Sequence, residues 1–132
     1  MSIAAETPLM RLPMDLQHLV ATIKAHPDYH KVGMIACHNG VVRSTSRDGR
    51  EVEGLRIEVN REILECILAE ERRRPGIIEV LAHVFEGPRR VGDDVMLVAV
   101  AGDIRENVFP VLAETVEQLK QLVTHKEELF VD

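Results

Sequence analysis

The sequence is poor in aromatic side chains and in cysteine. It contains no tryptophan, one tyrosine and three phenylalanines, which argues against an aromatic platform for stacking nucleic-acid bases. Its two cysteines, Cys37 and Cys66, are far apart. Their number and spacing argue against a disulfide framework, and we expect both thiols to behave as small buried apolar side chains.

Several other signals are missing. No apolar run approaches the length of a membrane span, and the first residues lack the basic start and apolar centre of a secretory leader. The six histidines have no cysteine or carboxylate partners at zinc-site spacing. There is no glycine-rich phosphate loop and no nucleophile elbow. We therefore expect a cytoplasmic protein that binds no metal and no cofactor.

Positive charge is also in short supply, since the formal net charge is -6. Proteins that bind nucleic acid generally present a basic surface, so this class is disfavoured. The same balance means that any site for a small anion must be a local cluster of basic residues held against the charge of the whole chain.

The residues that are present predict one globular domain. A chain of 132 residues with 45% apolar and 29% charged side chains can bury a core of its own. We take residues 1–132 as a single domain in which 1–12 form a flexible or edge segment. A first helix is predicted after Asp15, a possible N-cap, and ends before Pro27; a second follows Asn60, another candidate N-cap.

The third helix is predicted from about Asp103 to about His125, because apolar residues recur there at spacings of three or four. Pro110 lacks an N–H group, so we expect a kink or a late start around Phe109. Lys120 would then lie near the end of this helix.

Four strands are predicted between the helices. The first, VGMIACHNGVVR, is expected to turn at Asn39-Gly40, and the second is EVEGLRIEV. The segments IIEVLAHVF and DDVMLVAVAG are the most apolar, and EGPRRVG reads as an irregular hairpin connection between them. Helices interleaved with hairpin-like strands predict an α+β fold with a mostly antiparallel sheet and flanking helices.

Four basic residues stand out by their position. Arg43 closes a strand, Arg105 opens a helix, and Lys120 and Lys126 lie near the end of that helix. A helix start favours an anion, and an arginine there adds a fork of donors. Taken alone, each of these side chains can equally be a solvated surface charge.

Residues 32–128 as a whole resemble the large, catalytic subunit of molybdopterin synthase, the MoaE family. The resemblance rests on the order and spacing of four segments: VGMIACHNGVVR, LRIEV, LAHVFEGPRRVGDDVMLVAVAG and IRENVFPVLAETVEQLKQLVTHKEE. It implies a hammerhead-like α/β subunit that forms a homodimer within a heterotetramer. It also implies a transferase in molybdenum cofactor biosynthesis.

The implied reaction moves sulfur from the thiocarboxylate of a small ubiquitin-like, MoaD-like partner ending in Gly-Gly to cyclic pyranopterin monophosphate. By resemblance, Lys120 and Lys126 are the functional lysines, and Arg43 and Arg105 hold the pterin phosphate. The neighbouring positions expected to line the substrate site are Val41, Val42, Ile104, Glu127 and Glu128. A lysine in such a pocket suits acid-base chemistry, because burial and nearby cations lower its pKa.

One feature leaves the activity open, and another concerns how the site is assembled. Ile104 stands where the family has a histidine before the arginine, so a divergent, non-catalytic relative that binds an anion or a protein partner is an alternative. Arg105 and Lys120 are also fifteen residues apart, about 22 Å along a straight helix. We therefore expect a site shared between two copies of the chain.

Overall fold

The computed structural model describes residues 14–131, and the predicted edge segment 1–12 lies outside this range. The helices are α2 (Leu16–Lys24), α3 (Arg61–Arg72) and α4 (Arg105–Gln118), with short helical turns η1 (Tyr29–Lys31) and η2 (Leu119–Val123). The strands are β1 (Met34–Val41), β2 (Val52–Val59), β3 (Ile77–Val84), β4 (Gly87–Arg90), β5 (Asp94–Gly102) and β6 (Thr124–Phe130).

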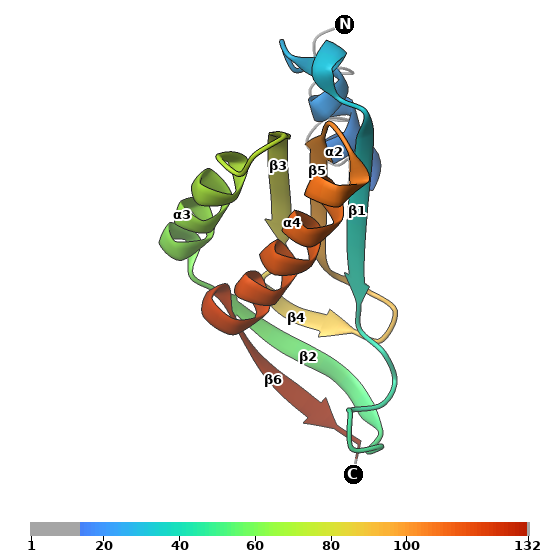
Figure 1. Ribbon diagram of the computed structural model, residues 1–132. Helices are drawn as coiled ribbons and strands as arrows, with labels where there is room; N and C mark the ends of the chain where they lie inside the picture. Colours follow the sequence, from blue (N-terminus) through green and yellow to red (C-terminus); the bar gives the residue numbers. More distant parts are fainter. Residues whose placement is uncertain (1–13, 132) are drawn as a thin grey trace, which may run out of the picture.

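The strands form two three-stranded antiparallel sheets, ordered β1-β5-β3 and β4-β2-β6 (Figure 1). Strand β5 is the centre of the first sheet and is apolar along its length, as expected for a strand covered on both faces. The second sheet lies below the first and carries the end of the chain in β6. The predicted α+β fold with antiparallel sheets and flanking helices is confirmed.

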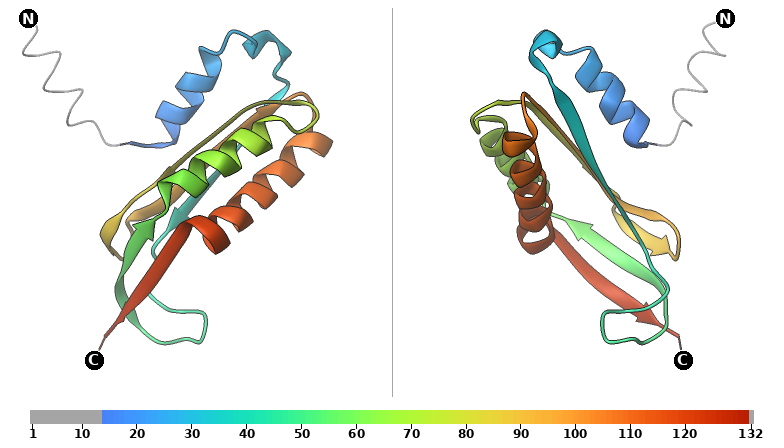
Figure 2. Two further views of the ribbon diagram at one scale, coloured as in Figure 1. Left: turned by 90° about the vertical axis from the view of Figure 1, so that its left-hand side faces the viewer. Right: turned by 45° about the vertical axis from the view of Figure 1, so that its right-hand side comes forward.

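Helices cover both faces of the first sheet. Figure 2 shows α2 on one face and the pair α3 and α4 on the other. Alternate residues of β5 divide between two apolar clusters: Leu97 and Ala99 pack with Ile23 of α2, whereas Val98 and Val100 join the larger cluster that includes α3 and α4. The period-two alternation of β5 thus supplies a core on each side.

Local signals set the starts of two helices as predicted. The side chain of Asp15 accepts a hydrogen bond from the backbone N–H of His18, and that of Asn60 accepts one from Ile63. Each carboxylate or amide oxygen satisfies a donor that the first turn of a helix leaves without a partner.

Two predictions about the strands were wrong. Asn39-Gly40 is not a turn, because β1 runs through it in register with β5 and only shifts register between Gly40 and Val41. The segment between β3 and β5 is also more than a hairpin connection, since it contains β4, which pairs with β2 of the other sheet. Pairing with a distant strand decides both outcomes, and local sequence does not report it.

The third helix differs from its prediction at both ends. It begins at Arg105 and continues through Pro110, so the late start predicted around Phe109 does not occur. The α-helix ends at Gln118, and the π-helical turn η2 leads directly into strand β6. His125, expected in the helix, is therefore a strand residue paired with Glu58.

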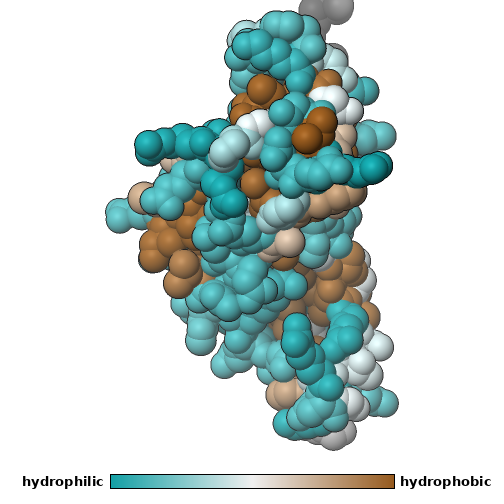
Figure 3. Space-filling view, viewed as in Figure 1, coloured by the Kyte–Doolittle hydropathy of each residue, from teal (hydrophilic) through white to brown (hydrophobic). Residues whose placement is uncertain are grey.

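The surface agrees only partly with expectation. Cys37 and Cys66 are free thiols, as predicted, but both are exposed rather than buried. Hydrophilic residues cover most of the face seen in Figure 3, and apolar residues appear there in separate patches. No helix within residues 14–131 is long and apolar enough to cross a membrane.

Candidate functional site

A cavity of about 860 Å³ lies where the two sheets meet the end of α4. Its walls come from the end of β1, the loop after it, the start of β5, strand β2, the turn η2 and strand β6 (Figure 1). The residues that line it are His38, Gly40, Val41, Val42, Arg43, Thr45, Ser46, Arg47, Val52, Leu55, Val95, Met96, Lys120, Lys126 and Glu128.

The cavity is strongly cationic within an acidic protein. Arg43, Arg47, Lys120 and Lys126 face one carboxylate, Glu128. With His38 neutral, the wall carries a formal charge of +3, whereas the whole chain carries -6. This is the local basic cluster that an anion site requires in such a chain.

Strand register places Lys126 and Glu128 in the cavity wall. In the pairing of β2 with β6, Lys126 lies opposite Ile57 and Glu128 opposite Leu55, and both of these β2 residues are buried. Residues directly opposite each other in an antiparallel pair share a face of the sheet. Both charged side chains therefore stand on the inner face.

The π-helical turn η2 positions Lys120. A π turn contains more residues than an α turn and is often found at functional sites. Here the wider turn is closed by Thr124, whose hydroxyl donates to the carbonyl oxygens of Leu119 and Lys120 at 3.4 Å. Leu119 is fully buried, and it anchors the turn to the core next to Lys120.

Backbone hydrogen bonds hold the loop that carries Arg43 and Arg47. The N–H of Val42 donates to Asp93 and its carbonyl accepts from Gly92, at 2.9 and 2.8 Å. Further along, the guanidinium of Arg50 lies 3.6 Å from the centre of the Phe130 ring, which joins the loop to the end of β6. The two arginines of the wall are thus carried by a braced segment.

Two titratable groups in the cavity are perturbed. Partial burial, the charge of Lys120 and that of Arg47 lower the pKa of Lys126, and Glu128 opposes this shift. Burial, with smaller contributions from Lys120 and Lys126, lowers the pKa of His38. Both shifts have the same origin: partial burial and neighbouring positive charges disfavour the protonated form of each group.

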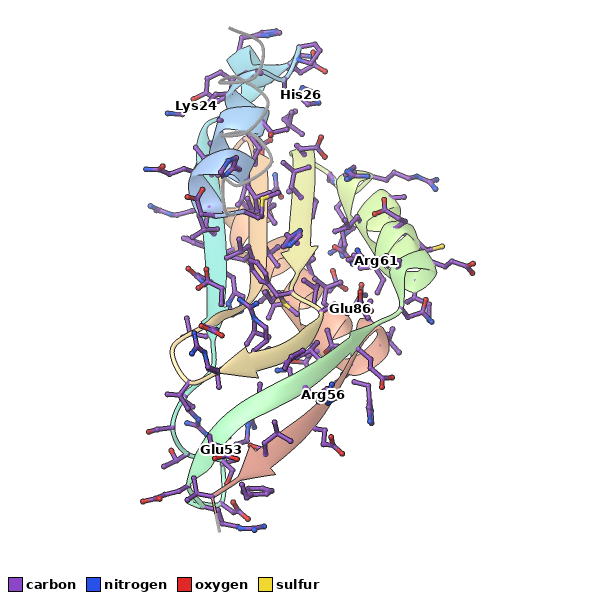
Figure 4. The ribbon with its side chains drawn as sticks, turned by 180° about the vertical axis from the view of Figure 1, so that it is seen from behind. Lys24, His26, Glu53, Arg56, Arg61 and Glu86 are labelled. Carbon is purple, nitrogen blue, oxygen red and sulfur yellow. The ribbon has the colours of Figure 1, made fainter. Side chains whose placement is uncertain are left out.

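The structure brings six of the nine predicted site residues to this cavity: Val41, Val42, Arg43, Lys120, Lys126 and Glu128. The other three lie elsewhere. Glu127 pairs with Arg56 on the opposite face of the second sheet, where Figure 4 shows Arg56. Ile104 and Arg105 are at the far end of α4, and sequence reasoning did not single out His38 or Arg47 as cavity residues.

The start of α4 has its own negative group. The carboxylate of Asp103 accepts hydrogen bonds from the backbone N–H of Ile104 at 2.7 Å and from the amide of Asn107 at 2.8 Å. These bonds lower the pKa of Asp103. The side chain of Arg105 is 76% exposed and lies 3.6 Å from the carboxylate of Glu106. Within one copy of the chain, this end of the helix holds an exposed cation rather than a lined cavity.

A second hollow lies beside the start of α3. Its arginine, Arg61, is paired with Glu86 at 3.1 Å (Figure 4), so it does not offer a free cation cluster. Across residues 14–131, no three histidine, cysteine or carboxylate side chains gather in a way that could hold a metal ion. The cationic cavity is therefore the better candidate site.

Comparisons with known proteins point in one direction. The model of the MoaE protein family matches residues 9–122. Molybdopterin cofactor biosynthesis protein E from Burkholderia multivorans is 30% identical, with a TM-score of 0.71 over 92% of this chain and 86% of that one. The MoaE protein from Burkholderia ambifaria is 26% identical, with a TM-score of 0.70 over 90% and 84%.

A more distant structure shares the fold alone. It is a complex of subunits 1 and 2 of molybdopterin-converting factor from Helicobacter pylori, 15% identical, with a TM-score of 0.67 over 90% of this chain and 85% of that one. No curated protein matches the sequence.

Proposed function

The chain belongs to the MoaE family, which acts in molybdenum cofactor biosynthesis, and from this premise we propose that it is the sulfur-transferring large subunit of a molybdopterin synthase. The thiocarboxylate at the Gly-Gly end of a small ubiquitin-like subunit would supply the sulfur. Cyclic pyranopterin monophosphate would accept two sulfur atoms, one from each of two thiocarboxylates that are left as carboxylates, and become the dithiolene of molybdopterin.

One observation carries the proposal: four cations line a single cavity in an acidic chain. The pterin substrate has a phosphate and the sulfur donor is an anion, so a site for both must hold two negative groups close together. At an effective dielectric constant of 20, unit charges 4 Å apart interact by about 4 kcal/mol. Clustered arginine and lysine side chains offset the repulsion between two bound anions.

The cavity suggests roles for three of its four cations. Arg43 lies two residues after the end of β1 and has the donor fork that fits a phosphate, so we assign it to the pterin phosphate. Lys120 acts as a general acid or base, or as the electrostatic partner of the thiocarboxylate. Lys126, whose pKa is lowered, is the second functional lysine and can exchange a proton nearer to neutral pH. Val41 and Val42 provide the apolar wall beside the pterin.

We also propose that two copies of the chain complete each site. Arg105 does not line the cavity of its own copy, and α4 runs unbroken between Arg105 and the end that leads to Lys120. A homodimer would bring Arg105 of one copy to the cavity of the other. Small subunits bound to each copy would make a heterotetramer, and the complex of two subunits from Helicobacter pylori supports a small-subunit partner. We place this assembly in the cytoplasm.

Reconstitution tests the function. The purified chain, a thiocarboxylated small subunit and cyclic pyranopterin monophosphate are mixed, and molybdopterin is measured with time. We expect turnover that falls by at least about 100-fold in Lys120→Ala, the lower range for loss of an acid-base group. Lys24→Ala is the control, because Lys24 is an exposed lysine at the end of α2, away from the cavity.

The alternative function makes a different prediction. Ile104 is an exposed isoleucine at a position where the family carries histidine, which favours a relative that binds an anion without sulfur transfer. Such a protein would bind sulfate or phosphate in the cavity and give no molybdopterin with any thiocarboxylated partner. That pair of results would replace the synthase proposal with the binding module.

A further inference from the structure

His38 is the one histidine that lines the cationic cavity, and it has no place in the roles proposed above. It lies in β1 opposite Val98 of β5, on the face of the first sheet that carries α3 and α4. Its Nε2 atom is buried and has no hydrogen-bond partner within the described residues. Buried polar atoms are nearly always hydrogen-bonded in native proteins, so an atom without a partner calls for a physical explanation.

The charged groups that share the cavity wall with His38 come from three segments of the chain. Lys120 comes from η2, Lys126 and Glu128 from β6, and Arg43 and Arg47 from the segment after β1, while β2 and β5 contribute only apolar residues to the wall. Position 40 is glycine, and a Cβ atom there would lie 3.2 Å from the Nε2 atom. A larger residue at position 40 would therefore crowd the imidazole, and glycine lets the ring lie against its own strand.

Two simpler roles fit poorly. A histidine used only for packing would be expected to bond its ring nitrogens, because an unpaired buried nitrogen weakens the fold. A metal-binding histidine needs further ligands, and no group of three possible ligands is present within residues 14–131. What remains is a ring in the wall of a cationic cavity, with its pKa lowered by burial and by the two lysines.

We propose that His38 contacts the anion that fills this cavity, turns its ring so that Nε2 donates a hydrogen bond to it, and takes up one proton as the anion binds. A doubly charged anion offsets the field of the two lysines and supplies the missing acceptor, so the protonated ring becomes favourable only in the complex. The cavity then gains a fifth cation when it is filled. This selects dianions, the class that includes phosphate monoesters, over singly charged ions.

The inference rests on the proposed function only in placing an anion in this cavity. It adds that binding is coupled to protonation of one named residue. Affinity for a dianion should then rise as pH falls through the neutral range, by up to about tenfold per pH unit, the limit for uptake of one proton.

Sulfate is the probe, because it stays doubly charged across this range whereas phosphate titrates within it. NMR of the histidine rings in the full chain is recorded against pH, with and without saturating sulfate. We expect the titration of His38 to move to higher pH with sulfate. His125, on the outer face of β6, is the internal control and should not move. An unchanged His38 titration would overturn the proposal.

Calorimetry of sulfate binding gives the second measurement. Proton uptake, read from two buffers of different ionisation enthalpy, should disappear in His38→Gln and persist in His125→Gln. Lys126 also has a lowered pKa, so uptake that survives in His38→Gln would assign the proton to this lysine and refute the role of His38. Sulfate that fails to bind at all refutes both the inference and the cavity as an anion site.

These outcomes separate the two proposals. Sulfate binding coupled to His38, together with no sulfur transfer in reconstitution, would keep the inference and remove the synthase function. Sulfur transfer with sulfate binding that is independent of His38 would do the reverse. The NMR measurement uses the unaltered chain, so it decides the matter even if His38→Gln fails to fold.

Discussion

The two ends of α4 carry similar cations in different surroundings. At the start, Arg105 is 76% exposed, and the negative group nearest the helix amides is the chain's own Asp103. At the other end, η2 turns Lys120 into a cavity that also contains Lys126. The difference shows that a basic residue becomes part of a binding site through the chain segments that converge on it.

The different surroundings of the two ends of α4 have a simple structural cause. The start of α4 follows strand β5, and the two segments that reach this junction contribute backbone groups: the N–H of Gly33 donates to Gly102, and Gly76 accepts from the N–H of Asp103. The end of α4 passes through η2 into β6, which runs back along β2 and brings a second lysine to the first. Whether the exposed start of the helix joins a site in another copy is the point that the first prediction addresses.

The largest expected effect comes from mixing two inactive variants. Arg105→Ala and Lys120→Ala chains should each have almost no sulfur-transfer activity. Mixing them as equal, freely exchanging dimers should restore about a quarter of wild-type turnover, because half the dimers are mixed and each has one intact site. Reconstituted molybdopterin formation measures it. Mixtures that stay inactive would place both residues in one copy, and an active Arg105→Ala chain would remove Arg105 from the site.

Charge reversal at each end sharpens the comparison within one copy. Lys126→Glu should lower sulfate affinity by about tenfold or more, since it replaces an attraction by a repulsion at close range. Arg105→Glu should change it by less than about twofold when the copies are separated by dilution, because Arg105 lies outside the cavity of its own copy and its charge is screened. Titration calorimetry on diluted protein gives both affinities. Equal losses would show that the two ends act on the same anion.

The middle of α4 offers a test of stability. Glu71 of α3 is buried near Glu114 of α4, and Arg74 pairs with both carboxylates. Burial, and then the charge of Glu114, raise the pKa of Glu71 to about 7. The folded chain therefore binds more protons than the unfolded chain between the ordinary pKa and this value. Stability should fall as pH rises through that window, with the full cost present above it.

Glu71→Gln removes the titrating group and keeps its shape. At pH 8 we expect the variant to be more stable than the wild type by about 1 kcal/mol, because it no longer buries a charged carboxylate beside that of Glu114. At pH 4.5 the gain should vanish. Urea unfolding at the two pH values measures the difference, and exposed Glu65→Gln on the same helix is the control. A gain that is equal at both pH values would contradict the assignment.

The smallest expected effect is on folding stability, which the positive charge of Lys126 in the cavity reduces. The pKa of Lys126 is lowered, so the folded chain binds fewer protons than the unfolded chain between that lowered value and the ordinary one. The cost of its charge is present below this window and is relieved as pH rises. Lys126→Met should raise Tm at pH 7 by about 1–3 °C while weakening sulfate binding. Lys24→Met is the control, and a fall in Tm would show that the charged lysine stabilises the fold.

The parts of the fold that the sequence predicts are those with local causes. The N-caps Asp15 and Asn60 mark two helix starts, and the apolar run of β5 identifies the central strand. Strands β4 and β6 were missed because their residues are polar or are poor strand formers and become strands only by pairing with β2. The apolar repeat of the last helix continues through η2, so the sequence pattern does not show where the α-helix ends.

The residues of the candidate site were likewise predictable only in part. Arg43, Lys120 and Lys126 were identified because a family resemblance gave their order, and the fold then places them together. His38 lies within one of the segments that carry the resemblance, yet a lone histidine in a strand gives no signal of its partners. Only the meeting of β1, η2 and β6 shows that its surroundings are cationic.

The register of β6 fixes the sign of the cavity as well as its shape. Lys126 and Glu128 face inward, and Glu127 faces outward, because alternate residues of a strand point to opposite faces. Deletion of one residue between η2 and Lys126 would turn Glu127 inward and Lys126 outward with the composition of the strand almost unchanged. A change in the length of this short junction should therefore alter the charge of the cavity far more than a substitution within it.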